Sequence, residues 1–95
     1  MTLEEVRKEV EEIDKQIIEL IQKRTQLAEE IVKIKKKNNT PIEDTEQNQK
    51  VINRATDLAT EKNLDTGNIK QIFQLLIQMN IQKQHSLKGE GGNLP

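Results

Sequence analysis

The sequence predicts an all-α protein with three helices, one very long and two shorter. Apolar residues recur at steps of three and four along most of the chain, and polar breaks divide this pattern twice. No segment alternates apolar and polar residues for long enough to form a strand. The 95 residues are expected to form one domain over 1–88, followed by a Gly-rich, disordered tail over 89–95.

The first helix is expected from Thr2 to about Asn38. Thr2 can cap it, and Glu5 three residues later can complete a capping box. Pro41 prevents the helix from continuing. The apolar residues of this helix form one line of heptad character, called here the apolar stripe: Leu3, Val6, Val10, Ile13, Ile17, Leu20, Leu27, Ile31 and Ile34.

Two shorter helices are expected to follow. The second runs from about Glu46 to Lys62 behind a cap at Asp44 or Thr45, and the third from about Gly67 to Leu87 behind Asp65 or Thr66. The apolar face of the second is formed by Val51, Ile52, Ala55, Leu58 and Ala59. The apolar face of the third is formed by Ile69, Ile72, Phe73, Leu76 and Met79.

The length of the first helix predicts a dimer at least. About 36 residues in a helix reach roughly 54 Å, whereas a compact chain of this size has a radius of gyration of only about 12–13 Å. The rest of one chain cannot cover such a helix. A second copy or a large partner must therefore bury the apolar stripe.

Composition excludes several classes of function. The net charge of −1 gives no overall attraction to nucleic acid or to an anionic membrane. The absence of cysteine excludes disulfides, zinc–thiolate sites and thiol catalysis, and no apolar run is long enough to span a membrane. The acidic start at Glu4 and Glu5 is unlike a signal peptide. We expect a cytoplasmic protein without metal, cofactor, nucleic-acid or membrane partner.

Arg24 stands where the apolar stripe should continue. A buried polar residue at such a position can simply fix the register of paired helices. It can also line a closed pocket of low dielectric, where a guanidinium binds a carboxylate through two parallel hydrogen bonds. Arg24 is therefore a candidate ligand for an anion.

Two further cations of the first helix could join Arg24. Lys35 lies eleven residues further on, with its Cα roughly 16 Å away on nearly the same side, although most lysines at a helix terminus are solvated. Arg7 lies 28 residues before Lys35, or roughly 42 Å along the helix. Arg7 is either a surface residue or a contribution from an antiparallel partner.

The apolar face of the third helix continues into Asn80 and Gln84. These two amides are four residues apart and share a helix face. They either point into a pocket or mark the place where the helix becomes polar on leaving the core. His85, the only histidine, is expected on the surface because no nucleophile or acidic cluster neighbours it.

The order of these features resembles the all-α (AroQ-type) chorismate mutases over about residues 3–87. The resemblance is carried by Leu3 to Arg7, Ile13-Asp14, Arg24 with Leu27-Ala28, Ile34-Lys35, Pro41-Ile42-x-Asp44, Asn63-Leu64-Asp65 and Ile72-Phe73-Gln74-Leu75. It implies an intertwined homodimer with two pockets, each of which takes one arginine from the other chain.

The resemblance also implies an isomerase of aromatic amino-acid biosynthesis that rearranges chorismate to prephenate. Such a reaction needs no cofactor and no covalent intermediate, because confinement and charge stabilisation suffice. Lys35 and Gln84 would donate to the ether oxygen, and Arg24 would hold a carboxylate. The remaining ligands of the substrate would be Arg7 of the partner chain, Asp44 near the ring hydroxyl and Asn80 beside a carboxylate.

One departure from this family occurs at the start of the second helix. Gln47 and Asn48 stand where the family usually has an Arg-Glu pair. The loss of one charged hydrogen bond predicts an efficiency lower by roughly one to two orders of magnitude. Lys50, one turn further on, is a candidate to compensate in part.

Two alternatives stay open from the sequence. One is an isochorismate pyruvate lyase on the same fold, since its pocket residues overlap with those of the mutase. The other is a catalytically weakened or regulatory helical dimer, which the changes at Gln47 and Asn48 would fit.

Overall fold

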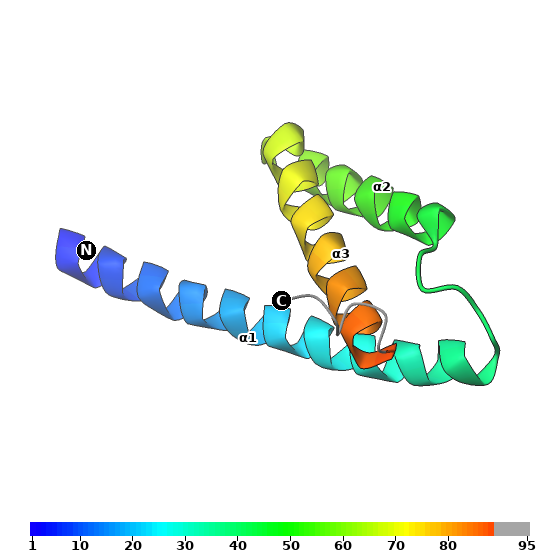
Figure 1. Ribbon diagram of the computed structural model, residues 1–95. Helices are drawn as coiled ribbons and strands as arrows, with labels where there is room; N and C mark the ends of the chain where they lie inside the picture. Colours follow the sequence, from blue (N-terminus) through cyan, green and yellow to red (C-terminus); the bar gives the residue numbers. More distant parts are fainter. Residues whose placement is uncertain (89–95) are drawn as a thin grey trace.

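The computed structural model describes residues 1–88, which form three α-helices and no strand. They are α1 (Leu3–Lys37), α2 (Thr45–Glu61) and α3 (Thr66–Lys88) (Figure 1). The all-α class with one very long helix is therefore confirmed, and each end lies within two residues of its predicted position. The tail predicted over 89–95 lies outside the described residues.

Side-chain caps begin the three helices. Each capping oxygen accepts a hydrogen bond from the backbone N–H three residues further on, at 2.8–3.1 Å, which satisfies a donor that has no partner inside the helix. The capping residues are Thr2, Asp44 and Asp65. Of the alternatives left open by the sequence, Asp44 and Asp65 are thus the caps.

Asparagines end the first two helices. Asn39 and Asn63 have φ angles of 54° and 58°, in the left-handed region that asparagine tolerates better than most residues. The backbone N–H groups that follow then return to the last turn, from Thr40 to Lys35 O and from Leu64 to Ala59 O, both at 2.8 Å. These reversals turn the chain out of α1 and join α2 to α3 in a hairpin.

Helix α3 packs on both other helices, whereas α1 and α2 do not approach each other closely (Figure 1). The core of the chain is correspondingly small and consists of Ala28, Val32, Ile42, Val51, Ile52, Ala55 and Ala59. Leu58, Ile72 and Met79 belong to the predicted apolar faces of α2 and α3, but they are 44–52% exposed in the single chain. These side chains lie on helix faces that no other helix of this chain covers.

The N-terminal half of α1 extends beyond α2 and α3 (Figure 1). The chain measures 54 × 27 × 23 Å, and its radius of gyration of 16.5 Å exceeds the value of about 12–13 Å for a compact chain of this size. All nine residues of the apolar stripe are 40–65% exposed from Leu3 to Ile34. The apolar stripe is thus uncovered in the single chain, as predicted. The partner that would cover it stays a prediction. No described helix has the length and apolar character needed to cross a membrane.

Candidate active site

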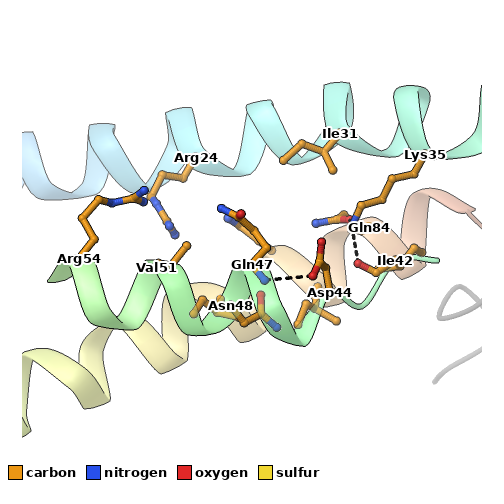
Figure 2. A pocket seen from close by; sticks show the side chains of 13 residues that line it. Arg24, Ile31, Lys35, Ile42, Asp44, Gln47, Asn48, Val51, Arg54 and Gln84 are labelled. Carbon is orange, nitrogen blue, oxygen red and sulfur yellow. Dashed lines mark hydrogen bonds between the residues drawn. The ribbon is translucent and has the colours of Figure 1, made fainter. Parts of the chain in front are cut away.

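A cavity of about 300 Å³ separates α1 from α2, and α3 closes its far side (Figure 2). It exists because α3 contacts both helices and holds them apart. Its volume suits a small organic molecule. The lining residues are Arg24, Ile31, Lys35, Ile42, Asp44, Gln47, Asn48, Val51, Arg54, Ile77, Asn80, Ile81 and Gln84.

Arg24 points from α1 across the cavity toward α2 (Figure 2). Its guanidinium lies 5.8 Å from the centre of the Phe73 ring, a contact that steadies the charge on an apolar surface. Its Nη1 is buried and has no hydrogen-bond partner in residues 1–88. Burial lowers the pKa of Arg24, and the nearby charge of Arg54 lowers it further. An acceptor that entered the cavity would satisfy an unpartnered buried donor of this kind.

Lys35 and Gln84 meet at the other end of the cavity. The Nζ of Lys35 donates to Gln84 Oε1 at 3.3 Å and also to the carbonyl oxygen of Ile42 (Figure 2). Gln84 is only 5% exposed, although it is polar and close to the end of α3. The surface interpretation of both residues is therefore wrong, because Lys35 is turned inward and Gln84 is buried.

The segment between α1 and α2 supplies the third wall. Ile42 is 5% exposed and anchors this segment in the core, which holds its carbonyl against Lys35. Asp44 lines the cavity while one of its oxygens, Oδ1, caps α2 by accepting from Gln47 N at 3.0 Å. The second carboxylate oxygen of Asp44 stays available for a ligand.

The structure brings five of the six predicted site residues to this one cavity. They are Arg24, Lys35, Asp44, Asn80 and Gln84. The sixth, Arg7, lies on the exposed part of α1 that α2 and α3 do not cover and does not line the cavity.

The cation that α2 contributes to the cavity is not the predicted one. Gln47 and Asn48 line the cavity as expected, but Lys50 does not, and it is exposed on the outer side of α2. Arg54 lines the cavity instead and was missed by the sequence analysis. The signal was present, because Arg54 follows Gln47 by seven residues, which places both on one helix face.

The charges of the cavity lining favour an anionic ligand. Three cations and one carboxylate line it, and the two ion pairs in residues 1–88 lie elsewhere, at Lys33–Glu30 and Lys83–Glu29. Neutral amides from α2 and α3 add further donors, while isoleucines and a valine supply apolar walls. Fold and site together define a helical protein with a cavity whose lining charges suit a small acid.

Comparison with known proteins is consistent with this class. The family model for chorismate mutase type II matches residues 6–85. The chain therefore belongs to the chorismate mutase type II family, and the family identified from the sequence motifs is confirmed.

Three individual relatives have chorismate mutase in their names. The chain is 39% identical over 85 residues to the chorismate mutase of Methanocaldococcus jannaschii, covering 87% of this chain and 86% of that protein. It is 38% identical over 81 residues to a bifunctional chorismate mutase/prephenate dehydratase of Buchnera aphidicola subsp. Schizaphis graminum, covering 85% of this chain. The corresponding bifunctional protein of Escherichia coli K12 is 27% identical over 82 residues. The chain spans about a fifth (21%) of the length of these two bifunctional relatives.

Proposed function

We propose that this chain converts chorismate to prephenate in the cavity between α1 and α2. The observation that carries the proposal is the pairing of two donor groups across one cavity. The guanidinium of Arg24, whose Nη1 has no hydrogen-bond partner in the described chain, occupies one end of the cavity, and the Lys35–Gln84 pair occupies the other. Chorismate is a small dianion with an ether oxygen, and these are the groups that such donors recognise.

The chemistry follows from this arrangement. In the rearrangement one carbon–oxygen bond of the enolpyruvyl ether breaks while a carbon–carbon bond forms, within one molecule and without transfer of a proton. The cavity would hold the substrate in a chair-like conformer, which reduces the entropy lost on reaching the transition state. Lys35 and Gln84 would donate to the ether oxygen as negative charge grows there, and Arg24 would hold a carboxylate. These three residues are the proposed catalytic groups.

Asp44 and Asn80 would complete the binding of the substrate within one chain. The free carboxylate oxygen of Asp44 can accept from the ring hydroxyl, since Oδ1 already caps α2. The Asn80 amide lines the cavity one turn before Gln84 and can support a carboxylate.

We further propose an intertwined homodimer in which Arg7 reaches the cavity of the other chain. The exposed apolar stripe supports this assembly, because a row of large apolar side chains on an unsupported helix needs a covering surface. Arg7 lies on that same uncovered part of α1, too far along the helix to reach the cavity of its own chain. A location in the cytoplasm stays a prediction.

The names of the relatives support the mutase over the isochorismate pyruvate lyase, since those reported above are named chorismate mutases. The regulatory alternative, a helical dimer without catalysis, would need no unpartnered donor inside a cavity. Analysis of the products formed from chorismate and from isochorismate separates the three functions.

The deciding experiment measures the loss of chorismate absorbance on addition of the purified protein, wild type beside Lys35→Ala. We expect turnover by the wild type and a loss of at least a hundredfold in Lys35→Ala, because a charged donor to the ether oxygen is removed. Lys37→Ala, an exposed lysine of the same helix terminus, is the matched control and should keep full activity. A wild-type rate at background would refute the proposed function.

A further inference from the structure

We propose that Arg54 is a substrate-binding residue that grips, together with Arg24, one carboxylate of the substrate from the opposite helix. The proposal rests on the proposed function for the identity of the acid. It assigns to α2 a cation that the sequence motifs did not indicate.

The geometry places two guanidinium groups at one end of the cavity. Arg54 extends from α2 toward α1, and its guanidinium lies next to that of Arg24 (Figure 2). The two residues belong to helices that do not otherwise approach each other closely. Arg54 is exposed in the single chain and Arg24 is half-buried. Two guanidiniums that face one cavity from opposite walls can each donate to the same carboxylate.

No carboxylate of the chain neutralises this pair in residues 1–88. The ion pairs of the described chain are formed by other residues, and the cavity carboxylate, Asp44, lies toward the Lys35 end (Figure 2). The charge of Arg54 also lowers the pKa of Arg24, so the two cations destabilise each other while the cavity is empty. An anion bound between them would remove that repulsion, which makes this end of the cavity selective for a negatively charged group.

Arg54 is the one cation that α2 contributes to the cavity lining. The three lining residues of α2 before it, Gln47, Asn48 and Val51, are uncharged, and Lys50 faces the outer side of the helix. Seven residues separate Gln47 from Arg54, which is two helical turns, or about 10.5 Å. Compared with a cation at position 47, the positive charge at Arg54 thus lies closer to Arg24 and farther from Lys35.

The alternative interpretation of Arg54 is a solvated residue on the outer side of α2, and this alternative determines the control variant. Arg54 also borders a groove on the outer side of α2, together with Lys50 and Asp57. If Arg54 were only a solvated surface residue, its neutralisation would have the same small effect as that of Lys50. Lys50 therefore provides a charge-matched control on the same helix.

The test compares Arg54→Gln, Arg54→Lys and Lys50→Gln in the full chain, with chorismate as substrate. We expect kcat/KM to fall about tenfold or more in Arg54→Gln, mainly through KM, because one charged hydrogen bond to the substrate is lost. Arg54→Lys should recover part of that loss, since it restores the charge without the guanidinium fork. Lys50→Gln should change kcat/KM by less than about twofold. Equal values for Arg54→Gln and Lys50→Gln would overturn the proposal.

A second measurement separates this proposal from the proposed function. Millimolar sodium sulfate should raise the melting temperature more than sodium chloride of equal ionic strength, in the wild type and in Lys50→Gln but not in Arg54→Gln. If the wild type does not turn over chorismate yet shows this difference, the proposed function fails and the anion site stands. If sulfate stabilises all three proteins equally, the assignment of Arg54 fails whatever the activity.

Discussion

Lys35 donates a hydrogen bond to Gln84 Oε1 at 3.3 Å and joins the C-terminal part of α1 to that of α3. This contact uses the oxygen of the amide, so the NH2 group is the part of Gln84 that can donate to a ligand. A second hydrogen bond, to the carbonyl of the core residue Ile42, fixes the ammonium group in the cavity. The two proposed donors to the ether oxygen therefore hold each other in position.

The first prediction concerns pH. The wild-type rate should vary little between about pH 5 and pH 7.5, because an amide donates without being protonated and the guanidinium of Arg24 stays charged well above this range. Gln84→Glu should behave differently, since a carboxyl group donates only when it is protonated. Its rate should therefore fall steeply as the pH rises through the pKa of the new carboxyl group. The check is kcat/KM against pH for both proteins, and a steep loss in the wild type over this range would contradict the role of Gln84.

The second prediction concerns the sharing of the cavity between two chains. Arg7→Ala and Arg24→Ala should each lose at least a hundredfold in kcat/KM, because each removes a guanidinium from a substrate carboxylate. Mixed in equal amounts and allowed to exchange chains, they should recover about a quarter of the wild-type activity. Half of the dimers are then mixed, and one of their two cavities has both arginines.

The control for this mixture is a pair of variants that cannot complement each other. Arg24→Ala mixed with Lys35→Ala should stay inactive, since both changes damage the cavity wall that a single chain provides. Recovery in that control, or none with Arg7→Ala, would exclude the shared cavity.

The fold could be predicted from the sequence because its signals are local. Helix ends depend on caps such as Asp44 and on asparagines such as Asn63, and heptad spacing identifies α1 without knowledge of its neighbours. Which apolar residues of α2 and α3 are buried within one chain could not be predicted in this way. Periodicity defines the apolar face of a helix but does not say which chain covers it, and Leu58 and Ile72 are consequently exposed here.

Parts of the site could be predicted for a similar reason. Arg24 interrupts an apolar stripe, which marks it at once, whereas Arg54 stands on a polar helix where one more cation attracts no attention. Its position at the cavity depends on the space that α3 keeps between α1 and α2. The carbonyl of Ile42 could not be predicted either, since every residue carries a backbone carbonyl and only the fold aims this one at Lys35.

The third prediction concerns the start of α2. Gln47 and Asn48 both line the cavity, so the double change Gln47→Arg with Asn48→Glu puts an ion pair beside the substrate. We expect kcat/KM to rise roughly ten- to a hundredfold, because the new guanidinium can make one more charged hydrogen bond. The glutamate should limit repulsion of the new guanidinium by Arg24 and Arg54.

The matched control for that variant is Gln49→Arg with Asn53→Glu. It makes the same two chemical changes at exposed residues of α2 that do not line the cavity, and kcat/KM should stay within about twofold. If the cavity-facing double variant gains no more than this control, the placement of α2 against the substrate is wrong.

The fourth prediction concerns the cost in stability of an empty anion site. Arg24→Met should raise the free energy of unfolding by about 1 kcal/mol, because it removes a buried donor without a partner and its repulsion by Arg54. Loss of the contact with Phe73 reduces this gain but does not cancel it. The melting temperature, measured at a fixed protein concentration, should rise by roughly 2–8 °C while activity disappears. Lys23→Met, on the exposed side of α1, should leave both quantities nearly unchanged, and a lower melting temperature for Arg24→Met would show that the guanidinium stabilises the fold instead of serving a ligand.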